Sequence, residues 1–397
     1  MKVLVLATDL FSRSGISRYT STLAESLSTL LGAENVDVLC FFSWGYSGVS
    51  PHEFRVTGMV TNRPHADAWS RLRFLLNATR AGFRGYDLII ANHIVLAPVA
   101  AMLNLIFRIP YWVACHSVEI WWGTSLARHV ALKRASLILP VSHYTAQVIL
   151  KIEGVRSSRV KVLYNAIPDS FDRALRSREL VRRSHIDPKR GIPRLLSVCN
   201  LVRTNGFKGV DTVIRALPAL LKVFPNLRYT VVGEGEIRAE LESLANRTGV
   251  GQSVLFLGEV SDAELAKQYR DCDVFVLPSR EQMKGQAGGE GFGRVYSEAA
   301  LAGKPVVGSR AGGASEAVLH GKTGFLVDPA STDQVSKAIL DILQDPELAK
   351  RLGSEGRKWA LETFSERALC KALRELLQSY GFENDSGRVL VHACEQL

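Results

Sequence analysis

Residues 194–199 read Arg194-Leu195-Leu196-Ser197-Val198-Cys199, and this short apolar run predicts a buried β-strand. A polar, glycine-containing loop follows at residues 200–210. The next residues have the apolar spacing of a helix at 212–223, for which we expect Asp211 as the N-cap. A buried strand that leads through a loop into a helix is the repeating unit of a parallel sheet covered by helices. The stretch therefore predicts an α/β fold.

The same alternation of strand and helix extends over most of the chain, in two series. The first series contains the strands that we expect at residues 2–7, 36–42, 88–91, 111–115, 137–141 and 160–164. The second contains those expected at 195–199, 229–232, 254–257, 274–277 and 305–308. This pattern predicts two doubly wound, Rossmann-like domains, with residues 1–180 in the first and 181–363 in the second. The arginine-rich stretch 169–193 is the expected connection.

The size and cysteine content of the chain agree with two domains in a reducing compartment. At 397 residues the chain exceeds what one core usually supports, and 47% of it is apolar. Its six cysteines show no CxxC spacing. We therefore expect buried thiols rather than a disulfide framework or a zinc site.

Two apolar stretches are candidates for targeting or membrane segments, and neither is expected to be one. Residues 1–7 are too short for a signal peptide and predict a first strand. Asn92 and His93 interrupt the apolar stretch 88–107, which predicts a strand and a buried helix rather than a transmembrane helix. The expected location is cytoplasmic.

The positive charge of the chain belongs to its N-terminal half. Residues 1–190 carry 24 Lys and Arg against 13 Asp and Glu, a net charge of +11, whereas the remaining residues carry 25 against 26, a net charge of −1. Arginines alternate with apolar residues at helical spacing in residues 70–84, next to Trp69. Such a segment either lies peripherally on an anionic membrane or forms an ordinary helix with a solvated basic face. Nucleic acid is not an expected partner, because no zinc, RNP or helix-turn-helix signature accompanies the charge.

Two cations bracket the loop that opens the second series. Arg203 and Lys208 lie on either side of residues 204–207, directly before the predicted helix. The N-terminus of a helix carries free N–H groups and a positive dipole end, so two cations beside it suit a diphosphate. Two solvated surface cations are the alternative interpretation.

A glycine-flanked carboxylate leads into another predicted helix. The stretch 289–300 places Glu290 in a turn and Glu298 inside the helix. The glycines let the backbone approach a ligand, and the first N–H groups of the helix point toward it. The residues expected to supply these N–H groups are Phe292, Gly293 and Arg294. The arrangement suits a phosphate ester with hydroxyls on both sides; a solvated turn residue and an exposed helix residue are the alternative.

Two further motifs predict structure rather than chemistry. Gly233-Glu234-Gly235 follows a strand as a dinucleotide fingerprint does, but the sixth position is Arg238 and the glutamate would repel a pyrophosphate. Asp271-Cys272-Asp273 imitates a metal clamp, but it lies between the end of a helix and the start of a strand, where carboxylates are commonly structural. No metal site is expected.

Together, these motifs resemble the retaining GT-B glycosyltransferases of family 4, over nearly the whole chain. The stretches that carry the resemblance are Arg203…Lys208-Gly209, 231–235, 254–260, 273–279, the E-x7-E motif Glu290…Glu298, 303–309, Gly312-Gly313…Glu316 and 321–327. None is decisive alone, but their order and spacing are specific. The resemblance implies two facing Rossmann-like domains and a final helix, about residues 364–380, that packs back on the first domain.

The resemblance also implies roles for individual residues. In similar proteins the Arg and Lys of the loop hold the donor diphosphate, the first Glu of E-x7-E lies by the donor sugar, and the second holds the ribose hydroxyls. These roles transfer to Arg203, Lys208, Glu290 and Glu298. His116 matches the histidine that approaches the donor hexose in similar proteins. Gly15 matches one glycine of the pair that lies over the phosphates. Gly258 and Val260 match the turn whose backbone binds the base. The chain departs from the pattern at Ser14, which replaces one glycine of the pair, and at Ala166, where Asn-Gly is usual.

These expectations describe an enzyme. We expect retaining transfer of a hexose from a UDP- or GDP-hexose to a glycan or lipid-linked acceptor, in the synthesis of cell-surface polysaccharide, lipopolysaccharide or glycolipid. Two fixed cations neutralise the departing diphosphate, so no metal and no other cofactor is required. A sugar-nucleotide epimerase or phosphorylase of the same fold, and a non-catalytic carbohydrate-binding protein, are the alternatives.

Overall fold

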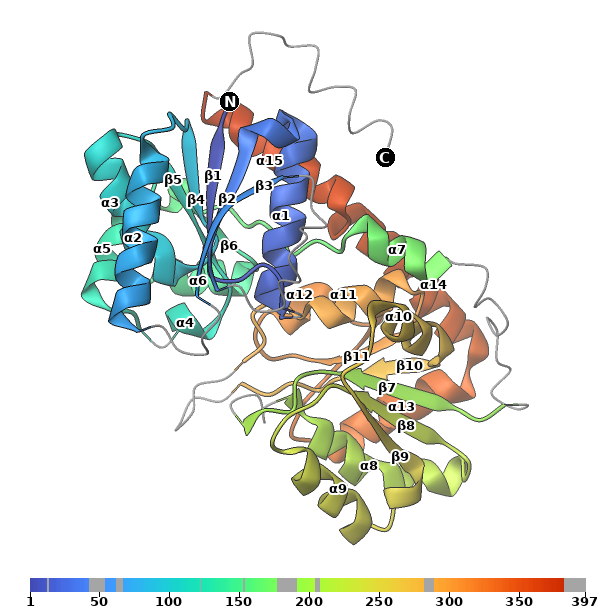
Figure 1. Ribbon diagram of the computed structural model, residues 1–397. Coiled ribbons are helices and arrows are strands. Elements are labelled where there is room, and N and C mark those ends of the chain that lie inside the picture. Colours follow the sequence, from blue (N-terminus) through green and yellow to red (C-terminus); the bar gives the residue numbers. More distant parts are fainter. Residues whose placement is uncertain are drawn as a thin grey trace. The chain divides into compact units, whose positions relative to one another are not determined.

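Two compact domains make up the part of the chain that the structure describes. The computed structural model describes residues 1–12, 14–42, 54–61, 67–121, 123–152, 154–176, 191–203, 208–281 and 289–381. One domain comprises Met1–Ala166 and the segment from Glu366 onward, and the other comprises Ile167–Ser365. Each contains a six-stranded parallel sheet flanked by helices (Figure 1), so the prediction of two doubly wound, Rossmann-like domains is confirmed.

The N-terminal domain has the strand order β3-β2-β1-β4-β5-β6. Its strands are β1 (Val3–Ala7), β2 (Val36–Phe42), β3 (Arg55–Thr61), β4 (Leu88–Ala91), β5 (Tyr111–Cys115) and β6 (Leu137–Pro140). Its helices are α1 (Gly15–Leu31), α2 (Ala68–Gly82), α3 (Ala97–Phe107), α4 (Val118–Trp121), α5 (Leu126–Arg134), α6 (His143–Leu150) and α15 (Glu366–Ser379). Helices α2, α3 and α5 cover one face of the sheet, and α15 packs on α1 on the other (Figure 1).

The C-terminal domain has the strand order β12-β11-β10-β7-β8-β9. Its strands are β7 (Arg194–Val198), β8 (Arg228–Val232), β9 (Val254–Gly258), β10 (Val274–Val276), β11 (Val306–Ser309) and β12 (Gly324–Val327). Its helices are α7 (Asp169–Arg176), α8 (Val210–Val223), α9 (Arg238–Arg247), α10 (Asp262–Asp271), α11 (Arg294–Leu301), α12 (Ala314–Ala317), α13 (Thr332–Gln344) and α14 (Pro346–Thr363). The strand order reverses between β7 and β10, and ligands of open α/β sheets bind at the carboxyl ends of the strands at such a point.

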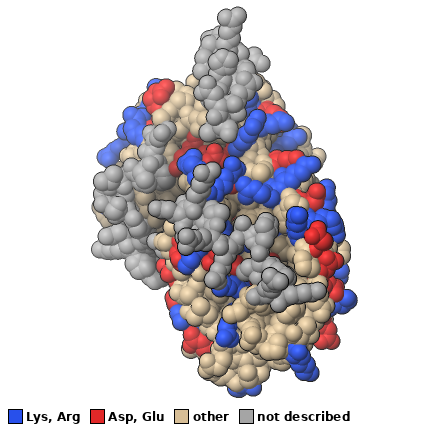
Figure 2. Space-filling view, turned by 90° about the vertical axis from the view of Figure 1, so that its right-hand side faces the viewer, with Lys and Arg blue, Asp and Glu red and all other residues tan. Residues whose placement is uncertain are grey.

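The described residues show how charge is distributed on one face of the molecule, whether a helix could span a membrane, and the state of the cysteines. On the face of the molecule drawn in Figure 2, Lys and Arg side chains are interspersed with Asp and Glu. Among the described residues, no helix combines the length and the apolar character needed to cross a bilayer.

The five described cysteines are free thiols, and four of them are buried: Cys40, Cys115, Cys272 and Cys370. Cys394 lies outside the described residues.

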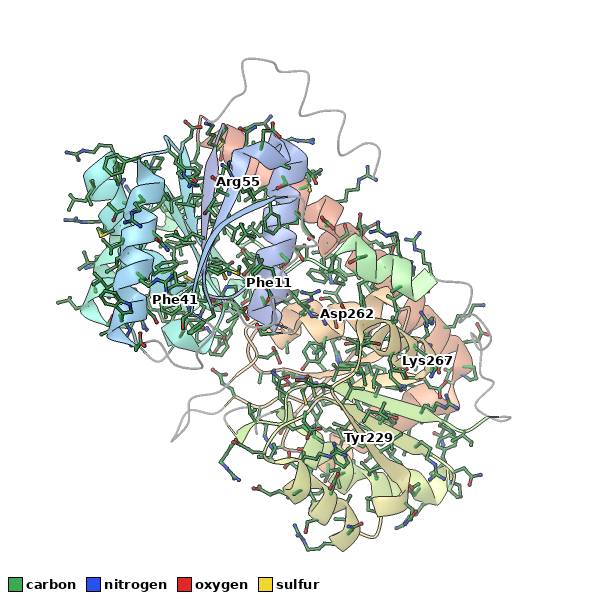
Figure 3. All side chains as sticks on the ribbon, viewed as in Figure 1. Phe11, Phe41, Arg55, Tyr229, Asp262 and Lys267 are labelled. Carbon is green, nitrogen blue, oxygen red and sulfur yellow. The ribbon has the colours of Figure 1, made fainter. Side chains whose placement is uncertain are left out.

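Buried apolar side chains fill both faces of each sheet (Figure 3). All residues of β1, β4 and β5 are buried, as expected for parallel strands covered on both sides. Short polar signals set the helix starts. The Ser14 hydroxyl accepts the N–H of Ser17 before α1, and the Asp67 carboxylate accepts the N–H of Ser70 before α2.

The prediction and the structure differ at three strands: two observed strands are not predicted, and one predicted strand is not observed. The edge strands β3 and β12 are not predicted, because strands at a sheet edge are not buried along their whole length and so lack a continuous apolar signal. In addition, β3 is mostly part-exposed, and its pairing with β2 shifts register between Val38 and Leu39. The expected strand at 160–164 is wrong, since this segment forms only an isolated bridge between Val160 and Ile138.

The boundary between the domains lies earlier than residue 180, because α7 belongs to the C-terminal domain. This helix lies within the stretch expected as a connection and packs on α10. There, Arg270 Nη1 donates to the Ala174 carbonyl at 2.5 Å, and the Phe171 ring packs edge-on against Tyr269. The arginine-rich composition conceals the buried face of α7. Residues 177–190, the rest of the expected connection, lie outside the described residues.

Candidate functional site

A lysine and a glutamate from different loops form an ion pair at the carboxyl edge of the C-terminal sheet. Lys208 Nζ lies 2.6 Å from Glu290 Oε2, and the two side chains are only 17% and 12% exposed. Lys208 follows β7 and Glu290 follows β10, and these strands are neighbours in the sheet. The pair therefore lies where open α/β sheets bind their ligands.

Glycines allow the Glu290 loop to pack closely. Gly293 adopts a left-handed φ of 85° directly before α11, and Gly313 donates its N–H to the Glu290 carbonyl at 2.8 Å. A Cβ on Gly313 would lie 2.0 Å from the Gly291 carbonyl oxygen, so no larger residue fits unless the main chain moves. The glycine pair of the family pattern, Gly312-Gly313, thus supports the loop that carries Glu290.

Glu298 lies inside α11 and is 3% exposed. Arg294 Nε donates to Glu298 Oε1 at 2.9 Å, and the Tyr269 hydroxyl donates to Glu298 Oε2 at 2.9 Å. A carboxylate offers about four acceptor directions, so these two bonds orient it and leave acceptor capacity on both oxygens. Glu298 is therefore a fixed, buried acceptor, and the alternative of an exposed helix residue is wrong.

Arg203 pairs with a neighbouring helix rather than with Glu290. Its guanidinium donates to Glu240 Oε1 on α9, and its side chain is 57% exposed. Its main-chain N–H donates to Glu236 at 2.8 Å. The structure therefore places the two predicted diphosphate cations in different surroundings, with Lys208 largely buried and Arg203 exposed. Residues 204–207 lie outside the described residues.

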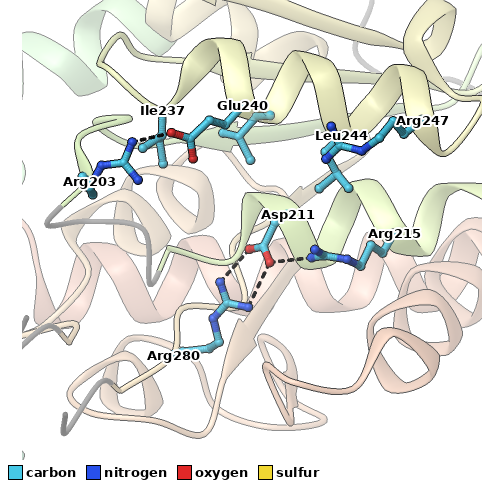
Figure 4. Close-up of a pocket in the computed structure, with 9 residues that line it drawn as sticks. Arg203, Asp211, Arg215, Ile237, Glu240, Leu244, Arg247 and Arg280 are labelled. Atoms are coloured by element: carbon cyan, nitrogen blue, oxygen red, sulfur yellow. Dashed lines mark hydrogen bonds and ion pairs between the residues drawn. The ribbon is translucent and has the colours of Figure 1, made fainter. Parts of the chain in front are cut away.

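Arg203 also lines a pocket of about 340 Å³ between α8 and α9 (Figure 4). The lining residues are Arg203, Asp211, Arg215, Ile237, Glu240, Leu241, Leu244, Arg247 and Arg280. Asp211 accepts bonds of 2.6 Å from both Arg280 and Arg215. Burial raises the pKa of Asp211, but the two arginines lower it more, so it lies below its ordinary value. The expected N-cap role of Asp211 is wrong: Gly209 precedes the first turn of α8, and Asp211 lies within that turn.

The other predicted donor-binding residues shape loops. Gly258 ends β9, its carbonyl accepts the N–H of Gly233 at 2.9 Å, and Val260 follows in the turn before α10. The Phe292 ring is buried and packs edge-on against Phe364, with 5.0 Å between ring centroids. Only the main-chain atoms of Phe292 are therefore expected to contact a ligand.

The two motifs expected to be structural make structural contacts. The Glu234 carbonyl, in the turn after β8, accepts the N–H of Leu201 from the loop after β7 at 2.9 Å. Asp273 accepts the N–H of Arg194 at 2.8 Å, and burial raises the pKa of Asp273. Within the described ranges, no three His, Cys, Asp or Glu side chains are grouped closely enough to hold a metal ion.

His116 lies at the carboxyl end of β5 in the N-terminal domain and is buried. Its Nε2 lies 2.7 Å from the carbonyl oxygen of Asn92, the residue that follows β4. Because a carbonyl only accepts, we assign the proton of the neutral ring to Nε2, which makes Nδ1 an acceptor. Burial holds the pKa of His116 below its ordinary value and so favours this neutral form.

His93 and Glu119 complete a titratable cluster around His116. The rings of His93 and His116 are stacked, with 5.7 Å between centroids, and Glu119 Oε1 accepts the main-chain N–H of His116 at 2.6 Å. Burial, together with the His116 ring, lowers the pKa of His93 to about 4. Burial raises the pKa of Glu119, but the two histidines and the main-chain N–H groups that donate to its carboxylate together lower it more, so Glu119 is a carboxylate at neutral pH.

The first loop of the N-terminal domain depends on Ser14 rather than on a glycine pair. The Ser14 hydroxyl caps α1, and a Cβ on Gly15 would meet nothing within 4 Å. The residue that departs from the family pattern therefore has a local structural role, and the packing around Gly15 does not require a glycine.

Three neighbours of the predicted site residues are not indicated by the sequence pattern. Tyr269 and Glu240 contact partners 29 and 37 positions away, and no local signal links them. His93 follows β4 as His116 follows β5, and neighbouring parallel strands end at the same edge of a sheet. That signal becomes usable only once the strand order is known.

Two doubly wound domains with polar and charged side chains at the carboxyl edges of their sheets define the GT-B class of architecture. The family model of Glycosyl transferases group 1 matches residues 184–359, and that of Glycosyltransferase Family 4 matches residues 13–171. The chain belongs to the group 1 glycosyltransferases.

Relatives of known name agree with this assignment. The chain is 34% identical, over 267 residues, to a GDP-mannose-dependent alpha-(1-6)-phosphatidylinositol monomannoside mannosyltransferase of Mycolicibacterium smegmatis, and the match covers 66% of this chain and 68% of the relative. It is 27% identical, over 341 residues, to a glycogen synthase of Mycobacterium tuberculosis, covering 82% of this chain and 77% of the relative.

Solved structures share the fold. The Anabaena protein HepE, solved in complex with UDP and glucose, matches with a TM-score of 0.75 at 23% identity, covering 96% of this chain and all of HepE. Sucrose-phosphate synthase of Thermosynechococcus elongatus matches with a TM-score of 0.74 at 21% identity, covering 96% of this chain and 99% of the synthase.

Proposed function

We propose that the protein transfers a hexose from a nucleoside diphosphate sugar to an acceptor hydroxyl, with retention of the anomeric configuration. The observation that carries the proposal is the largely buried pair of Lys208 and Glu290, followed on α11 by the buried carboxylate of Glu298. A cation and two carboxylates at one strand-end site match the three parts of such a donor: diphosphate, hexose and ribose.

Lys208 is proposed to hold the diphosphate. Glu290 already fixes the Lys208 ammonium within a largely buried site, and fixed cations stabilise the charge that develops on a departing phosphate. Arg203 is proposed as the second phosphate ligand, since its planar guanidinium suits phosphate geometry. Its present partner Glu240 is exposed, and exposed ion pairs are weak, so a phosphate can displace this contact.

Glu298 is proposed to hold the ribose. Its two oxygens are oriented by Arg294 and Tyr269, and each retains capacity to accept from a hydroxyl. Two neighbouring hydroxyls on a ring match two oxygens of one carboxylate. A buried, ionised acceptor makes stronger hydrogen bonds than an exposed one.

His116 and Glu290 are proposed to contact the hexose. His116 offers Nδ1 as an acceptor on a neutral ring, because Nε2 is bonded to the Asn92 carbonyl. Glu290 is engaged with Lys208, which favours a role in orienting the sugar over one as a covalent nucleophile. Retention is then explained by attack on the same face that the phosphate leaves, assisted by the phosphate itself. The two cations neutralise the leaving group, so the proposal includes no metal ion.

The Mycolicibacterium relative makes GDP-mannose the first donor to test, and its name makes a glycolipid the first acceptor. Cell-surface glycan synthesis is the corresponding biological setting. The test is a panel of UDP- and GDP-hexoses, with release of the nucleoside diphosphate followed in the presence and absence of glycolipid and oligosaccharide acceptors. We expect acceptor-dependent release with one donor and loss of that release in Lys208→Ala. Failure of every donor, or equal release by Lys208→Ala, would contradict the proposal.

A further inference from the structure

The pocket between α8 and α9 has the size and the lining of a ligand site, and we name it the α8–α9 groove (Figure 4). Its volume of about 340 Å³ lies within the range of small-molecule sites, about 300–1,000 Å³. Its apolar part comes from one side of α9, at positions i, i+4 and i+7. These residues are Ile237, Leu241 and Leu244.

The groove is separate from the proposed donor site. Among the described residues, Lys208, Glu290 and Glu298 are not part of its lining, and Arg203 is the residue that belongs to both. The groove lies on the side of α8 and α9, whereas the Lys208–Glu290 pair lies at the ends of β7 and β10. A ligand of the groove is therefore a second ligand and not the donor.

The two ends of the groove differ in charge. At one end, Glu240 accepts from the Arg203 guanidinium and Glu236 accepts the Arg203 main-chain N–H. Arg215 of α8 and Arg247, the last residue of α9, lie away from Arg203, at the other end (Figure 4). Seven residues of helix separate Glu240 from Arg247, which corresponds to a rise of about 10 Å.

Positive charge is in excess at the arginine end. Arg280 contacts both oxygens of Asp211, at 2.6 and 3.1 Å, so this pair is balanced by itself. Arg215 also donates to Asp211, at 2.6 Å, and adds a further charge. Among the described residues, Arg247 forms no ion pair with a carboxylate and donates to the Ser243 hydroxyl at 2.6 Å. Two guanidinium charges from two helices are therefore not balanced within the groove.

Both guanidinium groups can bind an anion. Arg215 and Arg247 are exposed, and a guanidinium has five N–H donors in a planar fork that suits phosphate. Each of the bonds just described uses one donor of its arginine. A cation at the end of a helix stabilises the helix dipole, which accounts for Arg247 but not for Arg215, in the second turn of α8. The pair of arginines is better explained by a shared anion.

We propose that the α8–α9 groove binds a phosphorylated monosaccharide, as a ligand additional to the sugar donor. A phosphate monoester carries about two negative charges at neutral pH, which match the two unbalanced arginines. The sugar ring then lies along the apolar side of α9, and its hydroxyls reach Glu240, whose carboxylate has acceptor capacity beyond the bond from Arg203. The volume of the groove favours a small molecule over a segment of protein or nucleic acid. The inference does not depend on the proposed transfer reaction.

Titration calorimetry on the full chain tests the proposal. The probes are glucose 6-phosphate, mannose 6-phosphate, the two free hexoses and inorganic phosphate. We expect binding of a hexose 6-phosphate, weaker binding of inorganic phosphate and no binding of the free hexoses. Arg247→Gln should lower the affinity for the hexose 6-phosphate about tenfold or more, since it removes charge-assisted bonds. The matched control is Arg351→Gln, at an exposed arginine on α14 of the same domain, and it should bind as the unaltered protein does.

Three comparisons separate the groove from the donor site. Lys208→Ala should leave binding of the hexose 6-phosphate unchanged, and Arg247→Gln should leave binding of a nucleoside diphosphate unchanged. Glu240→Gln should weaken binding of the hexose 6-phosphate but not of inorganic phosphate, because only the sugar contacts Glu240. Absence of binding by every phosphorylated probe, or equal losses in Arg247→Gln and Arg351→Gln, would overturn the proposal. So would binding that Lys208→Ala abolishes, because the phosphate would then lie in the donor site.

Discussion

Glu290 Oε2 lies 2.6 Å from Lys208 Nζ, across 82 positions of sequence, because β7 and β10 are neighbours in the C-terminal sheet. The pair brings a cation of the predicted phosphate loop to the first carboxylate of the E-x7-E motif. We expect Lys208→Ala to lower kcat/KM for transfer on the order of 100-fold, since it removes a charge-assisted contact that strengthens as the phosphate departs. Steady-state kinetics measure this.

Lys267→Ala is the matched control, because Lys267 (Figure 3) is a part-exposed lysine on α10. Its partner is its helical neighbour Glu264, outside the proposed donor site. The Lys267→Ala variant should transfer at the unaltered rate. If Lys208→Ala remains folded and keeps that rate as well, the donor site has been assigned to the wrong loop.

Arg203→Ala should also lower transfer on the order of 100-fold if Arg203 leaves Glu240 to bind phosphate. Glu240→Gln removes the competing charge and keeps Arg203, so it should retain or increase affinity for the nucleoside diphosphate. Kinetics and binding of both variants distinguish a ligand from a structural pair. Equal losses in Arg203→Ala and Glu240→Gln would show that the ion pair itself is what matters.

Glu298 and Glu290 should divide the donor between them. Glu298→Gln should weaken binding of the free nucleoside diphosphate, because charge-assisted bonds from two hydroxyls are worth about 1.5–3 kcal/mol each and an amide reproduces them poorly. Glu290→Gln should spare that binding and reduce turnover. Titration calorimetry on both variants decides the matter, and similar affinity losses would show that the division is wrong.

Transfer should not require a divalent ion. Activity is expected to persist in excess chelator, since Lys208 and Arg203 neutralise the leaving group. Asp271→Ala should lower the stability of the fold or have no effect, and it should not change the metal dependence. The reason is that Asp271 ends α10, where its Oδ2 lies 3.8 Å from Arg194 Nη1. A rate that a chelator abolishes and manganese restores would refute this expectation.

The histidine cluster should make the free energy of unfolding fall in acid. The pKa of His93 is about 4 in the folded protein and about 6.5 in an unfolded chain. Between these values the unfolded chain binds a proton that the native state does not. Stability is therefore complete above pH 6.5 and falls as the pH drops toward 4, by up to about 1.4 kcal/mol per pH unit. The lowered pKa of His116 acts in the same direction.

His93→Asn tests this, because the asparagine can still accept the N–H of Val95 that His93 Nδ1 accepts at 3.2 Å. Urea unfolding at neutral pH and near pH 5 should show a smaller loss in the variant than in the unaltered protein. Identical losses would mean that His93 is not the titrating group.

The sequence predicts the interior of both sheets well and their edges poorly. Strands such as β4 and β5 are fully buried apolar runs, and their bounds agree with the prediction. The edge strands β3 and β12 lack that signal, and α7 was concealed by its arginines. A strand buried on both faces is a continuous apolar run in the sequence. An edge strand, or a helix buried on one side only, contains fewer apolar residues and is harder to predict.

The site follows the same rule. Motif spacing indicates Lys208, Glu290 and Glu298, but the contacts that orient them come from distant residues, such as Tyr269 for Glu298. Pairwise geometry of this kind depends on strand order, which no local pattern encodes. Arg203 illustrates the limit, because the sequence places it beside Lys208 whereas the structure pairs it with Glu240.

NMR of a donor labelled with ¹³C at C1 of the hexose tests the proposed retaining hexosyl transfer from a nucleoside diphosphate sugar. We expect the C1 signal to lose its coupling to phosphorus and to reappear as a glycoside of the same anomeric configuration, only when acceptor is present. A glycoside of inverted configuration, free hexose alone, or a donor signal that never changes would contradict it.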